Sequence, residues 1–222
     1  MDVRERVERV RERIARACMR AGRSPEEVTL VAVTKGVEPE KIIEAFEAGI
    51  REFGENRVQE MERKMESLRG IREAARWHMV GHLQTNKVKK ALELFDTIQS
   101  VDSVKLAEAI NRRAQRKVPV FIQVNVSGEP TKFGFSPQEL PSALERIKSL
   151  SNLEIRGLMT IAPLTDDEKI LREVFRKLRE LRDAFGLEHL SMGMSNDFEI
   201  AVEEGATIVR IGRAIFGEED RL

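Results

Sequence analysis

The chain of 222 residues contains no tyrosine, a single cysteine and a single tryptophan. One cysteine, Cys18, excludes an internal disulfide framework and fits a reducing compartment. Without tyrosine, these residues cannot supply a phenol hydroxyl as a general base. Lysine plus arginine total 38, as do aspartate plus glutamate. This balance excludes a broad electrostatic attraction to nucleic acid or to an anionic membrane surface.

Long apolar segments are also absent. No stretch approaches the roughly 20 uncharged residues that a membrane-spanning helix needs. The beginning, MDVRERVERVRERIARACMR, is charged throughout and lacks the apolar core of a secretory signal. We therefore expect a cytoplasmic protein that binds neither membrane nor nucleic acid.

Apolar residues at the start of the chain recur every three or four positions, which predicts an amphipathic helix over 2–21. Asp2 is a candidate N-cap, and Gly22 follows the predicted end. Cys18 lies within this helix and is expected to fill the core.

Eight apolar runs of strand length follow, and a helical pattern succeeds each of them. The predicted strands span 28–34, 50–54, 77–82, 97–101, 118–126, 153–160, 189–192 and 207–211. The predicted helices span 39–48, 57–68, 85–94, 103–117, 137–150, 166–185 and 196–204, with a short helical turn after the last strand. This alternation favours a parallel α/β sheet, and eight units favour closure into a (β/α)8 TIM-type barrel. An open doubly wound sheet is the alternative, although no Gly-x-Gly-x-x-Gly follows the first strand.

No internal linker interrupts this pattern. We expect one domain over 1–222, made of an N-terminal helix at 1–22 and a barrel at 28–217.

Barrel sites lie at the C-terminal ends of the strands, and phosphate is often held after strands 7 and 8. Polar residues at the predicted strand ends are therefore candidates for a site. They are Lys35, Glu55, Asn56, His78, His82, Asn125, Met159 with Thr160, the stretch SMGMSND (191–197) and the stretch RIGR (210–213).

Lys35 ends the apolar run TLVAVTK and shares its predicted strand face with Val31 and Val33. An amine held away from water is a good nucleophile toward an aldehyde or ketone. The alternative is a lysine that reaches solvent at the end of its strand. Gly36 would allow a ligand to approach closely.

The last two glycine-bearing stretches suit a phosphate. Ser195, Asn196 and Asp197 stand at a predicted helix start, where backbone N–H groups favour an anion. Gly212 and Arg213 follow the final strand, at the second half of the phosphate site that barrels commonly use. Ordinary capping and turn formation are the alternative for each stretch.

The histidines do not form a metal site by spacing. His78 and His82 share a face of one predicted strand about 13 Å apart, too far to bind one ion together. A histidine in an apolar strand, such as His78, is more often packed and hydrogen-bonded than catalytic.

Five motifs carry a family resemblance: VAVTKG, FGENRVQE, WHMVGHLQTNK, GLMTIAP and SMGMSNDFEIAVEEGATIVRIGRAIFG. In this order and spacing, over residues 5–217, the chain closely resembles the pyridoxal phosphate homeostasis protein family. That resemblance implies a barrel similar to the N-terminal domain of alanine racemase. It also implies pyridoxal 5'-phosphate (PLP) as the bound cofactor.

Site residues follow from the resemblance. It implies that Lys35 forms an aldimine, or Schiff base, with PLP, and that Arg210 faces the pyridine nitrogen. Ser195, Gly212 and Arg213 would hold the phosphate. Relatives often carry a small hydroxyl residue where this chain has Arg213. The Arg213 guanidinium would either replace that hydroxyl as a phosphate contact or point to solvent. The ring would be lined by Asn56, His78 and Met159.

The implied function is intracellular PLP (vitamin B6) homeostasis, with little or no turnover and with PLP-dependent apo-enzymes as recipients. Arg210 can only donate hydrogen bonds, so the ring would be a weaker electron sink, which by itself does not exclude racemisation. We expect no second β-rich domain beyond residue 217, and without tyrosine the opposite-face base of alanine racemase is missing. A weak amino-acid racemase and a cofactor-free Schiff-base aldolase are the alternatives, and both a monomer and a homodimer remain open.

Overall fold

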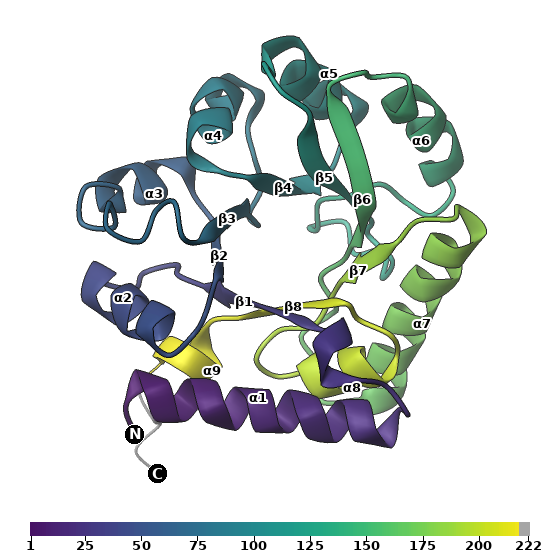
Figure 1. Ribbon diagram of the computed structural model, residues 1–222. Coiled ribbons are helices and arrows are strands. Elements are labelled where there is room, and N and C mark those ends of the chain that lie inside the picture. The colour runs from purple at the N-terminus through teal and green to yellow at the C-terminus, as the bar shows by residue number, and fades with distance from the viewer. Residues whose placement is uncertain (218–222) are drawn as a thin grey trace.

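Eight parallel strands close into a barrel in which each strand pairs with the next along the chain and β8 pairs with β1 (Figure 1). This computed structural model describes residues 1–217. The strands are β1 Thr29–Val33, β2 Glu52–Glu55, β3 Arg76–Met79, β4 Thr97–Val101, β5 Val118–Gln123, β6 Leu153–Met159, β7 His189–Ser191 and β8 Ile208–Ile211. The predicted TIM-type barrel is confirmed, and the open sheet is wrong.

Helices connect the strands and surround the barrel (Figure 1). They are α1 Val3–Arg20, α2 Pro39–Glu47, α3 Val58–Lys64, α4 Val88–Leu94, α5 Val104–Arg113, α6 Leu140–Lys148, α7 Glu168–Ala184, α8 Phe198–Glu203 and α9 Arg213–Phe216, with the 3-10 helices η1 Pro25–Glu27 and η2 Thr85–Lys87. Each predicted strand and helix is present, and several are shorter than predicted.

Five strands end earlier than the apolar pattern suggests, and the largest differences are in β3, which ends at Met79, and in β5, which ends at Gln123. The chain leaves β3 through Gly81, where an added Cβ would lie 2.2 Å from the backbone oxygen of Asn56. The loop after β3 therefore crosses closely over the end of β2. His82 lies in this loop, so the prediction that His78 and His82 share a strand face is wrong.

The first helix begins with a complete capping box. Asp2 Oδ1 accepts from the Glu5 N–H at 2.8 Å, and Glu5 Oε2 accepts from the Asp2 N–H at 3.0 Å. This arrangement satisfies two N–H groups that have no partner inside the helix and confirms Asp2 as the N-cap. Helix α1 lies beside α8 and α9 (Figure 1), and an ion pair of 2.9 Å joins Arg13 to Glu199 of α8.

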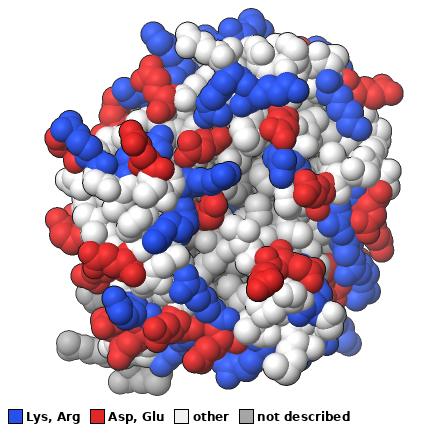
Figure 2. Space-filling model, viewed as in Figure 1, with Lys and Arg blue, Asp and Glu red and all other residues white. Residues whose placement is uncertain are grey.

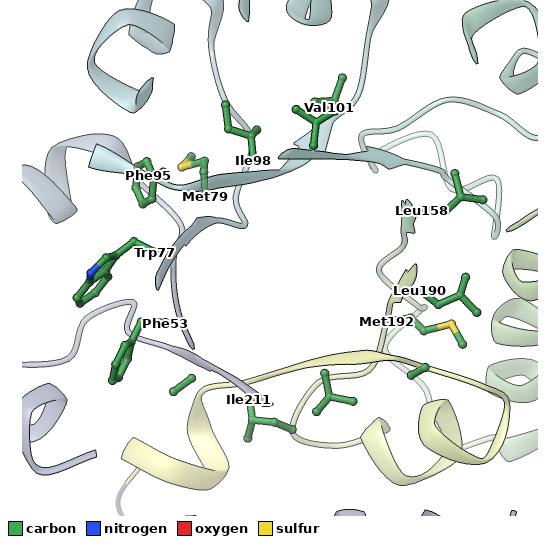
Figure 3. Close-up of a cluster of buried hydrophobic side chains, with 14 of the residues drawn as sticks. Phe53, Trp77, Met79, Phe95, Ile98, Val101, Leu158, Leu190, Met192 and Ile211 are labelled. Atoms are coloured by element: carbon green, nitrogen blue, oxygen red, sulfur yellow. The ribbon is translucent and has the colours of Figure 1, made fainter. Parts of the chain in front are cut away.

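The core has two parts because successive strand residues point to opposite faces of the sheet. Large side chains such as Phe53 and Trp77 point outward from the barrel toward the helices (Figure 3), and their rings stack at 5.1 Å between centroids. A small cluster of Val31, Phe121, Met159 and Ile208 forms a separate group of buried residues. Cys18 is fully buried in the outer part, which confirms that it fills the core.

Charges of both signs intermingle over the face shown in Figure 2, in agreement with the balanced composition. No helix within residues 1–217 combines the length and the apolar character required to cross a bilayer.

Candidate functional site

A cavity of about 570 Å³ lies where the loops after six of the strands meet the ends of β1 and β8. Its volume is within the usual range for small-molecule sites. The wall consists of Val33, Asn56, Val80, Gly81, Lys132, residues 161–165, residues 194–197, Arg210, Gly212 and Arg213. These residues follow the C-terminal ends of the strands, which is where the barrel rule places a site.

Arg210 brings a positive charge to the wall of this cavity. Its side chain comes from β8 and is almost completely buried. Nη1 donates to Ser191 Oγ at 2.7 Å, and Nη2 donates to the backbone oxygen of Thr160 at 2.8 Å. Nε has no protein acceptor within residues 1–217. Burial lowers the pKa of Arg210 to about 10, against the opposing effect of Asp197, so the guanidinium is still charged at neutral pH.

A chain of hydrogen bonds continues from Arg210 through the barrel. Ser191 Oγ donates to Gln99 Oε1 at 2.5 Å, and Gln99 Nε2 donates to His78 Nδ1 at 3.0 Å. His78 Nε2 lies 2.7 Å from Glu52 Oε2, and the network therefore places the histidine proton on Nε2. We call these five residues, Arg210, Ser191, Gln99, His78 and Glu52, the interior chain. It holds the guanidinium in one orientation.

An anion-binding arrangement lies at the ends of β7 and β8. Ser195, Asn196, Gly212 and Arg213 all line the cavity, and within residues 1–217 their backbone N–H groups donate to no protein acceptor. Backbone N–H groups that lack a protein acceptor and line a cavity can donate to an anion. Ser195 Oγ accepts from the Ala214 N–H at 3.2 Å and joins the two loops. This group suits a phosphate or a carboxylate.

The Arg213 guanidinium lies at the exposed rim of the cavity, where Nη2 donates to Asn196 Oδ1 at 2.5 Å. Asp197 is the acidic member of the wall and accepts from the Met194 N–H at 2.6 Å. Burial raises the pKa of Asp197 above its ordinary value of 3.8, although the Met194 N–H and Arg210 oppose this shift.

Lys35 is exposed, so the expectation of an amine held away from water is wrong. Strand β1 ends at Val33, and the chain then turns at Gly36, whose φ is +67°. This turn removes Lys35 from the strand register that Val31 and Val33 follow. Within residues 1–217, its amine has no hydrogen bond or ion pair. No described residue therefore engages the Lys35 amine, which is free to react with a ligand.

Buried charges support the turn that carries Lys35. Lys64 Nζ donates to the backbone oxygen of Thr34 at 2.7 Å, to Glu55 Oε2 at 2.9 Å and to Glu60 Oε1 at 2.7 Å. Glu60 Oε1 also accepts from the Gly36 N–H at 2.5 Å. The backbone on both sides of Lys35 is thereby fastened to α3.

The structure gathers five of the eight predicted site residues in the cavity wall: Asn56, Ser195, Arg210, Gly212 and Arg213. Lys35, His78 and Met159 are outside the wall. The two ring nitrogens of His78 are engaged in the interior chain, and Met159 is fully buried in the barrel interior. No group of three or more His, Cys, Asp or Glu within residues 1–217 is arranged to hold a metal ion.

Sequence reasoning missed Lys132 in the wall and Lys64 beneath the turn. Lys132 follows β5, so the rule of strand ends could have found it. Lys64 shares one helical face with Val58 and Met61, both buried, and a lysine on an apolar face indicates a buried ion pair.

Known proteins resemble the chain over nearly its full length. The family model described as alanine racemase, N-terminal domain, matches residues 6–220. The pyridoxal phosphate homeostasis protein of Aquifex aeolicus is 47% identical over 227 residues, covering 98% of this chain and 99% of that protein. The structure of PipY from Synechococcus elongatus PCC7942 with PLP bound has a TM-score of 0.86 and 37% identity, covering 97% of this chain and 100% of that one.

A more distant structure, alanine racemase from Corynebacterium glutamicum, has a TM-score of 0.71 at 18% identity, covering 95% of this chain and 61% of that one. This likeness concerns the fold alone and confirms the predicted alanine racemase-type barrel. With the full-length relatives, it leads to one assignment: the chain belongs to the pyridoxal phosphate homeostasis protein family.

Proposed function

We propose that this protein binds pyridoxal 5'-phosphate through Lys35 and serves intracellular PLP homeostasis, holding the cofactor with little or no turnover. The name of the Aquifex aeolicus relative and the PLP in the PipY structure support this proposal. The observation that carries it is a cavity wall that combines a buried guanidinium with four backbone N–H groups that have no protein acceptor within residues 1–217.

The residues of the cavity fit PLP by charge and by size. The N–H groups of Ser195, Asn196, Gly212 and Arg213 would donate to the dianionic phosphate, and the Arg213 guanidinium adds a positive charge at the rim. A volume of about 570 Å³ accommodates a ring with a phosphate arm. Asn56 and Val80 would line the ring from the loops after β2 and β3.

Arg210 would donate to the pyridine nitrogen from one of its remaining N–H groups, because Ser191 and Thr160 occupy only two of the five. A guanidinium gives no proton to that nitrogen and disfavours strong carbanion stabilisation. When bound, PLP would supply an aldehyde, and the Lys35 amine is the group that would hold it covalently. Gly36 has φ +67° and open space around it, which leaves the neighbouring lysine accessible.

A holding function is favoured over catalysis by the groups available for proton transfer. The 222 residues include no tyrosine. In the cavity wall, the proton-exchanging side chains are Asp197 and Lys132, and Asp197 is engaged by the Met194 N–H. Racemisation requires a proton to be removed on one face and returned on the other. We propose PLP-dependent apo-enzymes as recipients of the cofactor, a cytoplasmic location and a single-domain organisation.

The decisive experiment is addition of PLP to the purified protein, followed by borohydride reduction and peptide mapping. We expect a yellow protein labelled at Lys35, and no label at that position in Lys35→Ala. Lys41 is an exposed lysine of α2 that forms no ion pair with any residue of 1–217, so Lys41→Ala is the matched control and should remain yellow. A label at another lysine would contradict the site.

Incubation of the loaded protein with L-amino acids separates holding from catalysis. A stoichiometric spectral change without accumulating product supports the proposal. Sustained formation of the D-amino acid would replace it with the racemase alternative. A protein that stays colourless but cleaves a sugar phosphate would indicate the aldolase.

A further inference from the structure

A second cavity of about 380 Å³ lies between α3, η2 and the loop after β3. We call it the α3 cavity. Asn56 belongs to its wall and also to the wall of the main cavity, so the two are neighbours. The proposed function does not use the α3 cavity.

Cations dominate the wall of the α3 cavity. Arg57, Arg63 and Lys87 line it, and no carboxylate within residues 1–217 forms an ion pair with any of the three. Arg63 donates only to the backbone oxygen of Gln59, at 3.3 Å. Lys87 is half-buried. Arg57 and Arg63 are exposed, so only Lys87 is partly desolvated, and an anionic ligand would offset that cost while pairing with the two guanidinium groups.

One carboxylate stands among these cations. Glu60 uses Oε1 for Lys64 and for the Gly36 N–H, whereas Oε2 has no partner within residues 1–217. Although burial opposes it, the hydrogen bond from Lys64 lowers the pKa of Glu60, which stays ionised at neutral pH. Glu60 also accepts from the N–H of Gly36, the residue after Lys35, so the carboxylate of this cavity is linked to the turn that carries the proposed cofactor lysine.

Cations and a free carboxylate oxygen in one small cavity match a zwitterion. Val58 and Leu83 add apolar surface to the wall. We propose that the α3 cavity binds a free α-amino acid with a small apolar side chain. Arg57 and Lys87 hold its carboxylate, and Glu60 accepts from its ammonium group on the side of Lys35. This site goes beyond the proposed function, and its ligand binds whether or not the cofactor is present.

The test uses the full-length protein without added PLP, and binding is followed by NMR chemical shifts of the labelled backbone. The probes are L-valine, L-valinamide, which lacks the carboxylate, and isovalerate, which lacks the ammonium group. We expect L-valine to bind, and each analogue to bind about tenfold or more weakly, since each loses one charge-assisted interaction. The shifted resonances should lie in α3, η2 and the loop after β3.

Variants distinguish L-valine binding in the α3 cavity from a general effect of surface charge. Lys87→Gln and Arg57→Gln should each weaken L-valine about tenfold. Lys89→Gln is the matched control, because Lys89 is exposed on α4 and does not line the cavity. Unchanged unfolding midpoints in urea would show that each variant folds. Equal affinity for L-valinamide, or full binding in both cavity variants, would overturn the proposal.

Two further measurements distinguish L-valine binding in the α3 cavity from PLP binding. Lys35→Ala should bind L-valine as the unaltered protein does, even though it cannot link PLP. Failure of PLP labelling together with intact L-valine binding would refute only the proposed function. Inorganic phosphate that binds this cavity more tightly than L-valine would overturn the amino-acid assignment.

Discussion

Arg210 Nη1 donates to Ser191 Oγ at 2.7 Å, and this contact joins the cavity to a hydrogen-bonded chain that ends at Glu52. Ser191 is fully buried, and its hydroxyl accepts from the guanidinium while donating to Gln99. A single hydroxyl thereby fixes the orientation of the cation that we assign to the pyridine nitrogen. The orientation of Arg210 in the cavity wall therefore depends on Ser191, Gln99 and the rest of the interior chain, which do not line the cavity.

Removal of this hydroxyl should weaken both folding and cofactor binding. In Ser191→Ala, the guanidinium and the Gln99 oxygen each lose a buried partner, which should destabilise the fold by about 1–3 kcal/mol. Urea unfolding measures this cost, and titration with PLP should show lower affinity. Ser142→Ala removes an exposed hydroxyl and should change neither quantity. Full PLP affinity in Ser191→Ala would show that the interior chain does not position Arg210.

Lys64 should be essential for the turn that carries Lys35. Lys64→Met leaves the fully buried Glu55 without its cation and should destabilise the protein by about 3–5 kcal/mol in urea unfolding. Replacing both charges, as Lys64→Met with Glu55→Gln, should recover part of this loss, because no unpaired charge stays buried. Additive effects of the two substitutions would contradict a direct interaction.

Burial of Asp197 should make the free energy of unfolding depend on pH. Because burial raises its pKa above 3.8, the folded protein holds this proton more tightly than the unfolded chain does. Stability from this group is therefore complete below about pH 3.8 and is lost as the pH rises through the folded pKa. Asp197→Asn should gain stability relative to the unaltered protein as the pH rises through that window, measured by urea unfolding. A constant difference at every pH would refute the prediction.

Gly81 should tolerate no side chain. A Cβ there would lie 2.2 Å from the backbone oxygen of Asn56, so Gly81→Ala must displace the loop after β3 and should cost about 1–3 kcal/mol or more. PLP affinity should fall as well, because both residues line the cavity. Gly70→Ala is the control, since nothing lies within 4 Å of its Cβ position. Equal stability of the two variants would contradict the close approach.

Cys18 should resist thiol reagents in the folded protein. The side chain is fully buried, and burial raises the pKa of its thiol, with Arg23 opposing, so the reactive thiolate is scarce. Alkylation by iodoacetamide, followed by mass spectrometry, should be slow until urea unfolds the chain. Rapid labelling of the native protein would show that α1 separates readily from the barrel.

The repeating pattern of apolar residues determined the order and type of the secondary structure. All eight strands were identifiable as short apolar runs because both faces of a barrel strand are largely buried, and the Asp2 cap could be read from its neighbours. Strand ends were less certain: Val80 continues the apolar run of β3, yet the chain leaves the sheet there because Gly81 must pass over Asn56.

Motif and strand order in the sequence pointed to Ser195, Arg210, Gly212 and Arg213, which the structure places in the cavity wall, whereas the role of Lys35 stays a prediction. Only the tertiary structure decided that Lys35 is exposed on a turn, that His78 serves the interior chain, and that Lys64 lies beneath the site. The physical reason is the distance along the chain over which each property is determined. Backbone periodicity depends on near neighbours, whereas burial and the pairing of charges depend on residues that closure of the barrel brings together, such as Ser191 and Gln99.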